Sequence, residues 1–220
     1  MGSHRHGRRV VLITQAEAMN APAANALLKI LEEPPPNVHF VLVSSKASGL
    51  LPTIRSRCRL VTFGRPTSER AIAWLAEAGL GKEGAAYLDL AGGAPMRVAQ
   101  WKAESQLAPL GTLIDSLITP PADPLVLAAR WDQLLKSGGS ESTFRMEHLV
   151  EGVQRWLFDL TQEALAGRVR YHRGWPRPRL GTPPSPVALI TGWNELLRFR
   201  RAARHPLNQL LFLEDLATHT

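Results

Sequence analysis

The spacing of apolar residues along the chain changes character at about residue 65. The amino-terminal part holds two short apolar runs, Val10–Ile13 and Val38–Val43, with the length and composition of β-strands. The second run is almost unbroken, which is typical of a strand that is covered on both faces. Beyond residue 65 the apolar residues recur at helical spacing instead. The sequence therefore predicts an α/β segment followed by an all-helical one.

Helices and one more strand are expected around these two runs. Asn20 is a good helix N-cap, because its side chain can accept a hydrogen bond from an orphan backbone N–H of the first turn. The helix that follows ends at Pro34, since the residue before a proline is pushed out of the α region. Pro52 can open a short helix, and Leu60–Phe63 predicts a third strand of the same sheet. Strands that alternate with helices indicate parallel βαβ units.

Three short helices are predicted over residues 66–105. Thr67 is a good N-cap for the first helix, and Pro95 lies in the first turn of the third. Two consecutive glycines separate the second helix from the third. The expected helices are Thr67–Gly79, Lys82–Ala91 and Pro95–Ala103. Their short connections indicate a small bundle.

Residues 106–220 hold a larger set of predicted helices, each with an apolar stripe on one face. The longest is Phe144–Ala166. A Pro-, Gly- and Arg-rich stretch, Gly167–Pro186, interrupts the set and is typical of an exposed loop. The other helices are expected at Leu107–Leu117, from Asp123 onward, at Val187–Arg204 and at Pro206–Ala217.

Composition narrows the class of protein. Of the 220 residues, 45% are hydrophobic and 20% are charged, as in a folded globular chain, and the formal net charge of +7 favours an anionic partner. Cys58 is the single cysteine, which excludes internal disulfides and a Cys-rich zinc site, and no metal site is expected. No apolar run approaches the ~20 residues of a membrane-spanning helix, and Met1–Arg9 lacks the apolar segment of a secretory signal. We therefore expect a cytoplasmic protein without membrane contact.

The tripeptide Ser56-Arg57-Cys58 carries the strongest candidate chemistry. An arginine is always charged and planar, so Arg57 can offer forked hydrogen bonds to phosphate oxygens. Ser56 is expected to fix the local turn, and Cys58 to pack as a small apolar residue. Charge alone favours a plainer interpretation, in which Arg55, Arg57 and Arg59 form a solvated basic edge.

Three motifs, in this order and spacing, resemble those of the clamp-loader branch of the AAA+ ATPases. They are Ala16–Asn20, then Ala26–Lys29 with Leu31–Pro35, and Leu51–Cys58. The resemblance implies part of an AAA+ parallel-sheet core over residues 1–65, a helical lid over residues 66–105 and a helical collar, the oligomerisation domain, over residues 106–220. In that family the arginine of the Ser-Arg-Cys motif reaches a nucleotide held by the next subunit. The resemblance therefore favours a trans-acting arginine finger over the basic edge.

The groups that bind and hydrolyse ATP in this family have no counterpart in the sequence. It contains no phosphate loop of the G-x-x-x-x-G-K-[ST] type. The strand Val10–Ile13 is followed by Thr14 and Gln15, where the family has the acidic residues that hold magnesium and orient water. Ser45 and Arg97 match the two sensor positions and are expected to be vestigial. We therefore expect no bound cofactor and no ATPase activity of the chain alone.

The resemblance implies a non-catalytic subunit of a five-membered clamp loader, part of a replicative DNA polymerase holoenzyme. Arg57 would act on the ATP–Mg²⁺ of a neighbouring ATPase subunit while the complex loads a sliding clamp on primed DNA. One alternative is an ATP-hydrolysing motor subunit of the same loader, which Thr14 and Gln15 disfavour. The other is a free-standing, basic helical module that binds nucleic acid.

The loop after the longest predicted helix is a candidate for DNA contact. It combines arginines with aromatic residues and has no acid between residues 168 and 179, so it could bind phosphates and stack bases. A disordered, projecting loop is the alternative, given its Pro and Gly content. The candidate contacts are Arg168, Arg170, Arg173, Trp175 and Arg177.

The α/β domain of the resembled family begins roughly a hundred residues before the equivalent of Val10, so we expect an amino-terminally truncated chain. In AAA+ sheets a strand from that earlier part lies between the equivalents of Val38–Val43 and Leu60–Phe63. Without it, backbone groups of both strands would lack partners. Residues 1–65 are therefore expected to be loose or prone to aggregation.

Overall fold

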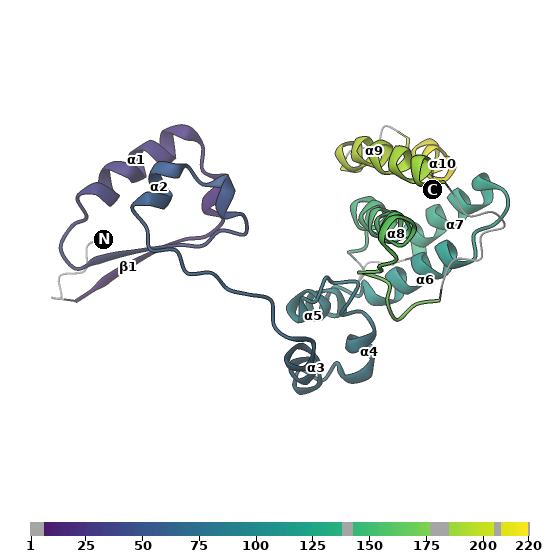
Figure 1. The fold of residues 1–220 in the computed structure, drawn as a ribbon, viewed down its shortest axis with the longest axis horizontal. Coiled ribbons are helices and arrows are strands. Elements are labelled where there is room, and N and C mark those ends of the chain that lie inside the picture. The colour runs from purple at the N-terminus through teal and green to yellow at the C-terminus, as the bar shows by residue number, and fades with distance from the viewer. Residues whose placement is uncertain (1–6, 138–142, 177–184, 205–207, 220) are drawn as a thin grey trace. The chain divides into compact units, whose positions relative to one another are not determined.

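The computed structural model describes residues 7–137, 143–176, 185–204 and 208–219 (Figure 1). The chain separates into two compact units, Met1–Gly64 and Arg65–Thr220, which we call the sheet unit and the helical unit. The sheet unit holds a small parallel sheet, and the described part of the helical unit has helices as its only regular elements. The chain is thus mostly helical with a small parallel sheet at its amino-terminal end. The lid and the collar as separate domains stay predictions.

Two parallel strands make up the sheet. β1 (Arg9–Ile13) pairs with β2 (Val38–Leu42) in a register that sets Val11 opposite Phe40. Phe40 packs against the core of the sheet unit, whereas Val41, whose side chain points to the other face, is 43% exposed. The prediction that this strand is covered on both faces is therefore wrong, because the helices of the unit cover only one face.

An N-cap residue and a proline set the starts of the two described α-helices of the sheet unit. Asn20 caps α1 (Ala21–Glu32), and its side-chain oxygen accepts a hydrogen bond from the third residue of that helix at 3.0 Å. α2 (Pro52–Ser56) starts with its proline, as predicted. Both helices lie on the same side of the sheet (Figure 1). The core cluster of this unit consists of buried Ala24, Leu27 and Ile54, with half-buried neighbours around them.

The segment of residues 60–63 forms no strand, contrary to prediction. Leu60 and Val61 are each 64% exposed, and Phe63 is 91% exposed. A strand requires partners for its backbone N–H and C=O groups. Among the described residues β1 and β2 pair only with each other. Strand-like composition was not sufficient here, because no neighbouring strand completes the pairing.

Three short helices open the helical unit. They are α3 (Ser68–Glu77), α4 (Gly81–Ala86) and α5 (Pro95–Ala103). Thr67 caps α3 and accepts a hydrogen bond from the N–H of Arg70 at 3.4 Å. α4 stops before its predicted end at Ala91, because the N–H groups of Tyr87 and Leu88 bond to carbonyls three residues back and tighten the turn.

Longer helices complete the described part of the unit. They are α6 (Leu107–Ile118), α7 (Pro124–Ser137), α8 (Met146–Ala166), α9 (Pro186–Ala202) and α10 (Gln209–Thr218). α10 packs against α7, and α9 against α8. All the helices of the unit except α4 contribute to one apolar core, in which buried Trp131 donates a hydrogen bond from Nε1 to Ser116 Oγ at 2.9 Å. Over the ranges described, none of the helices is both long and apolar enough to cross a membrane.

Candidate functional site

The corner after β1 holds the two residues that the resemblance predicts to stand in place of acidic ones. Thr14 and Gln15 follow the strand, and Gln15 adopts a left-handed backbone conformation with a φ of 52°. The first acidic residue is Glu17, in the 3₁₀ turn η1 (Ala16–Ala18). Its Oε1 accepts hydrogen bonds from Ser45 Oγ at 2.5 Å and from the Ser45 N–H at 3.2 Å. The carboxylate therefore connects the end of β1 to the segment after β2.

Glu17 is an acid with a strongly shifted pKa that sequence reasoning missed. The hydrogen bond from the Ser45 hydroxyl is the main cause that lowers the pKa of Glu17 from 4.5 to about 2. Its other oxygen, Oε2, is buried and has no hydrogen-bond partner among the described residues. A usable signal existed, since polar residues that follow neighbouring parallel strands meet at one edge of the sheet. A vestigial role for Ser45 stays a prediction, and the bond to Glu17 is its observed contact.

Arg57 lies at the carboxyl end of α2 with its guanidinium held on the surface of the sheet unit. Nη2 donates to Glu32 Oε1 at 2.6 Å, and Nη1 donates to the carbonyl oxygen of Thr53 at 3.0 Å. Ser56 Oγ donates to the same carbonyl at 2.9 Å and so helps to fix the turn. The side chains of Arg57 and Glu32 are 36% and 51% exposed. The guanidinium is thus ordered and accessible at the same time.

The nearby residues Arg55, Cys58 and Arg59 have no such polar contacts of their side chains among the described residues. Cys58 is half-buried and packs against the apolar core between α1 and α2. Arg55 and Arg59 are exposed, and neither forms an ion pair or a side-chain hydrogen bond with any residue that the structure describes. Of the three arginines in the alternative basic edge, Arg57 is therefore the one with an ordered carboxylate partner. Its role toward a nucleotide stays a prediction.

Sequence reasoning missed Glu32 as the partner of Arg57. Glu32 is the last residue of α1, and Arg57 caps α2, so their meeting depends on how the two helices pack. No local pattern connects residues that lie 25 positions apart. The available signal was only that both residues belong to the motifs that carry the family resemblance. An exposed pair of this kind contributes little to stability, so its carboxylate can be exchanged for another anion.

Arg97, which the resemblance predicts to be a vestigial sensor, ties two helices of the helical unit together. Its Nη2 donates to both carboxylate oxygens of Glu151 on α8, at 2.8 Å each. Arg155, also on α8, donates from Nη2 to Glu151 Oε1 at 2.6 Å. Burial acts to raise the pKa of Glu151, but the charges of Arg155 and Arg97 outweigh it and lower the pKa. The observed contact of Arg97 is therefore this ion pair between α5 and α8, and a vestigial sensor role stays a prediction.

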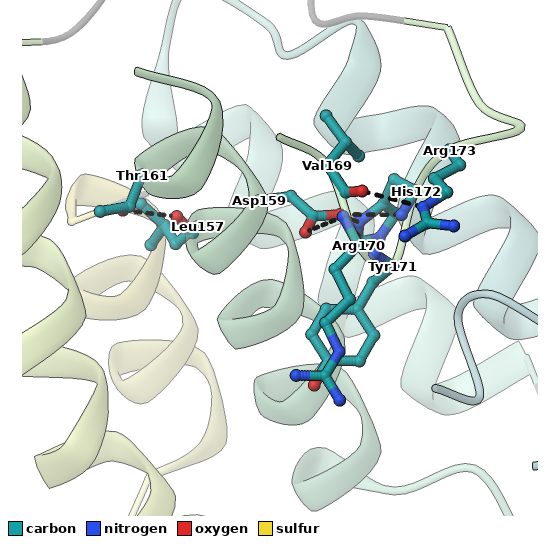
Figure 2. A network of polar contacts seen from close by, with 8 residues as sticks. All are labelled: Leu157, Asp159, Thr161, Val169, Arg170, Tyr171, His172 and Arg173. Carbon is teal, nitrogen blue, oxygen red and sulfur yellow. Dashed lines mark hydrogen bonds and ion pairs between the residues drawn. The ribbon is translucent and has the colours of Figure 1, made fainter. Parts of the chain in front are cut away.

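The start of the predicted exposed loop is folded onto α8 through Asp159 (Figure 2). Asp159 Oδ1 accepts a hydrogen bond from the N–H of Arg170 at 2.9 Å. Oδ2 accepts from the N–H groups of Tyr171 and His172 at 2.8 Å each, and lies 2.9 Å from His172 Nδ1. Burial acts to raise the pKa of Asp159, but the hydrogen bonds from the His172 ring and the three N–H groups lower it. Sequence reasoning missed Asp159, and it placed His172 among the aromatic residues of the candidate DNA-binding loop rather than against a carboxylate.

The candidate DNA contacts in this loop have unequal surroundings. Arg168, Arg170 and Arg173 are exposed. Trp175 is half-buried and meets Tyr87 edge-to-face, with ring centroids 5.8 Å apart. Arg177 lies outside the described residues. DNA binding by these side chains stays a prediction.

Residues 2–67 match the protein-family model described as DNA polymerase III, delta subunit. DNA polymerase III subunit delta' of Pseudomonas aeruginosa is 48% identical over 94 residues, which cover 41% of this chain and 28% of that one. The Escherichia coli protein of the same name is 46% identical over 69 residues, which cover 31% of this chain and 21% of that one. The chain therefore spans less than a third of the length of these relatives.

A solved structure adds a weaker likeness. A DNA polymerase III gamma subunit-related protein from Thermotoga maritima shares 21% identity with a TM-score of 0.43, over 96% of this chain and 72% of that one. The sequence matches, rather than this likeness, confirm the resemblance expected from the three motifs. It is a resemblance to the delta' subunit of the bacterial DNA polymerase III clamp loader, and residues 2–67 hold all three motifs.

Proposed function

We propose that this chain acts as a non-catalytic, delta'-type subunit of a DNA polymerase III clamp loader and supplies Arg57 to the ATP–Mg²⁺ of a neighbouring subunit. The observation that carries the proposal is the ordered, accessible guanidinium of Arg57 within the segment similar to delta' proteins. The partners would be the gamma/tau and delta subunits of a five-membered complex. Through that complex the chain would take part in loading the sliding clamp on primed DNA.

The chemistry suits a cation that acts across an interface. A guanidinium presents five N–H donors in a planar fork that matches the oxygens of a phosphate. Negative charge that spreads over the γ-phosphate oxygens during hydrolysis is stabilised by such a group, and arginine fingers in GTPases contribute about 10³–10⁵ in rate. Arg57 would leave Glu32 to reach the nucleotide. Because the Arg57–Glu32 pair is exposed, breaking it costs at most about 1 kcal/mol.

The residues of the sheet unit favour a non-catalytic subunit over an ATP-hydrolysing one. Thr14 and Gln15 are neutral and cannot replace two carboxylates at a magnesium ion. The carboxylate closest in sequence, Glu17, already accepts two hydrogen bonds from Ser45. These contacts favour a subunit that acts on another chain's nucleotide over a subunit that hydrolyses its own.

The test is reconstitution of the loader with Arg57→Ala in this chain. We expect hydrolysis at the adjacent subunit, measured in a single turnover, to fall by about 10³-fold or more, because the transition state loses its cation. Arg57→Lys should restore little activity, since it keeps the charge without the fork. Arg55→Ala is the matched control, because it removes an exposed arginine two positions earlier on the same short helix.

Co-elution of all subunits on size exclusion must accompany the kinetics. Normal turnover by an intact complex that contains Arg57→Ala would refute the arginine finger. Equal losses for the Arg55 and Arg57 variants would also refute it, since they would indicate a general effect of charge.

A further inference from the structure

A pocket of about 470 Å³ in the helical unit is lined by five arginines and one carboxylate. The carboxylate is Glu151 on α8. The arginines come from five separate parts of the chain, which makes their convergence a product of the fold. They are Arg65 before α3, Arg97 on α5, Arg155 on α8, Arg170 in the loop after α8, and Arg200 on α9.

Aromatic rings form part of the wall of the same pocket. Phe158 on α8 has its ring centroid 5.6 Å from that of Tyr171 and 5.8 Å from that of Trp193. All three side chains are half-buried, so each keeps some surface toward solvent. The pocket therefore offers cationic groups and ring surfaces side by side, the combination that proteins use for nucleotide units.

Two of the arginines are fixed by the carboxylate and by ring contacts. Arg155 is buried, bonds to Glu151, and lies over Tyr171 with its guanidinium carbon 5.6 Å from the ring centroid. Arg97, on α5, donates to the same carboxylate, and its guanidinium carbon lies 5.3 Å from the ring centroid of Trp101. Glu151 thus accepts three hydrogen bonds from these two guanidinium groups.

The backbone around Arg170 is fixed by the network of Asp159. Figure 2 shows the side chains of Arg170 and Tyr171 extending together, away from the Asp159 carboxylate. The guanidinium carbon of Arg170 lies 5.1 Å from the ring centroid of Tyr171. The Asp159 carboxylate bonds to backbone N–H groups and to the His172 ring, and not to the Arg170 guanidinium. It therefore fixes the position of Arg170 at the pocket and leaves the charge of the guanidinium unpaired by Asp159.

The other three arginines of the pocket lack a direct carboxylate partner among the described residues, although the charge of Arg200 acts on Glu151 from a distance and helps to lower its pKa. Neither Arg65, Arg170 nor Arg200 forms an ion pair with a carboxylate in the parts of the chain that the structure describes. A purely structural role would be complete with the Arg97–Glu151–Arg155 contacts that tie α5 to α8. Three further cations at the same pocket repel one another, and an anion would convert that repulsion into charge-assisted hydrogen bonds.

We propose that this pocket binds a phosphate-bearing ligand, with the phosphate among Arg97, Arg170 and Arg200. An attached base or sugar would lie against the aromatic wall. The phosphate could come from a single-stranded nucleic acid or from a free phosphate compound, and the two sources share this chemistry. The site involves no residue of the sheet unit, so it goes beyond the proposed action of Arg57 and does not depend on it.

The test uses the full chain and two probes at low salt, where screening is weak. The first probe is a fluorescein-labelled oligothymidylate followed by anisotropy, and the second is inorganic pyrophosphate followed by calorimetry. Arg200→Ala should weaken binding of at least one probe by about tenfold, the loss of one charge-assisted hydrogen bond. Arg198→Ala is the matched control, because it removes an exposed arginine of the same helix that pairs with Glu195 outside the pocket.

A third variant, Glu151→Gln, should change probe affinity in the opposite direction. Glu151→Gln keeps the shape of the side chain and an acceptor for both arginines, yet removes the charge that competes with the ligand. We expect it to tighten binding several-fold, which a purely structural defect would not do. Binding of the labelled strand identifies nucleic acid as the source, and binding of pyrophosphate alone identifies a free phosphate compound.

Three results would overturn the proposal. One is that neither probe binds the unaltered chain. Another is that Arg198→Ala and Arg200→Ala weaken both probes equally, which would mean that binding follows net charge. The last is that Glu151→Gln weakens binding although the protein stays folded by circular dichroism. The arginine finger is tested by turnover at the adjacent subunit and this pocket by probe binding, so a failure of one and a failure of the other give different results.

Discussion

The sheet unit and the helical unit differ in how much apolar surface holds them together. Among the described residues the core cluster of the sheet unit has three buried apolar residues, whereas the core of the helical unit has 31. Yet the sheet unit carries all three motifs shared with delta' proteins. The segment that resembles delta' proteins is therefore not the segment that contributes most to the stability of the chain, because burial of apolar surface dominates folding.

The largest effect is expected from truncation in the larger core. Leu149→Ala should lower the free energy of unfolding of the helical unit by about 2.7–5 kcal/mol, the range for a fully buried leucine. Ile54→Ala removes an equally buried residue from the sheet unit and should leave that transition unchanged. Tryptophan fluorescence in urea separates the two, since all six tryptophans lie after residue 65. An equal shift of the tryptophan transition in both variants would mean that the units unfold as one.

A smaller effect is expected from the Asp159 network, which fixes the loop after α8. Asp159→Asn should cost about 1–3 kcal/mol at pH 7, because an amide cannot accept all the hydrogen bonds that the carboxylate accepts. The same urea experiment measures this cost, with Thr161→Ala as a mild comparison, because half-buried Thr161 donates only to a carbonyl of its own helix.

The cost of Asp159→Asn should also depend on pH. The pKa of Asp159 is lower in the folded state than its ordinary value of 3.8, so its contribution is complete above that value. The contribution is lost as the pH falls through the lower folded pKa. The difference between the unaltered chain and the variant should therefore shrink between pH 7 and pH 2.5. A difference that stays constant would show that the charge of Asp159 is not what stabilises the loop.

The smallest effect is expected from the pair that holds Arg57. Glu32→Gln should change the stability of the sheet unit by less than about 1 kcal/mol, since both side chains are well exposed and the amide oxygen can still accept. Hydrogen exchange of the amides in α1 and α2 measures this change without relying on tryptophan. A loss of protection throughout α1 would show that the pair is structural, and would weaken the view that Arg57 can leave Glu32 at little cost.

The elements that sequence reasoning found are those set by local chemistry. Asn20, Pro52 and Thr67 mark helix starts because a cap or a fixed φ acts within one turn. The expected strand at residues 60–63 failed because strand pairing requires a partner from elsewhere in the chain. The pairs Arg57–Glu32 and Asp159–His172 were missed for the same reason, since each joins residues that only helix and loop packing brings together.

The most direct measurement is the position of the Arg57 guanidinium in a reconstituted loader bound to a non-hydrolysable ATP analogue, determined by cryo-electron microscopy. The account predicts a guanidinium nitrogen about 3 Å from a γ-phosphate oxygen of the nucleotide held by the neighbouring subunit, with the bond to Glu32 broken. A neighbouring site filled with nucleotide while Arg57 still rests on Glu32 would contradict it.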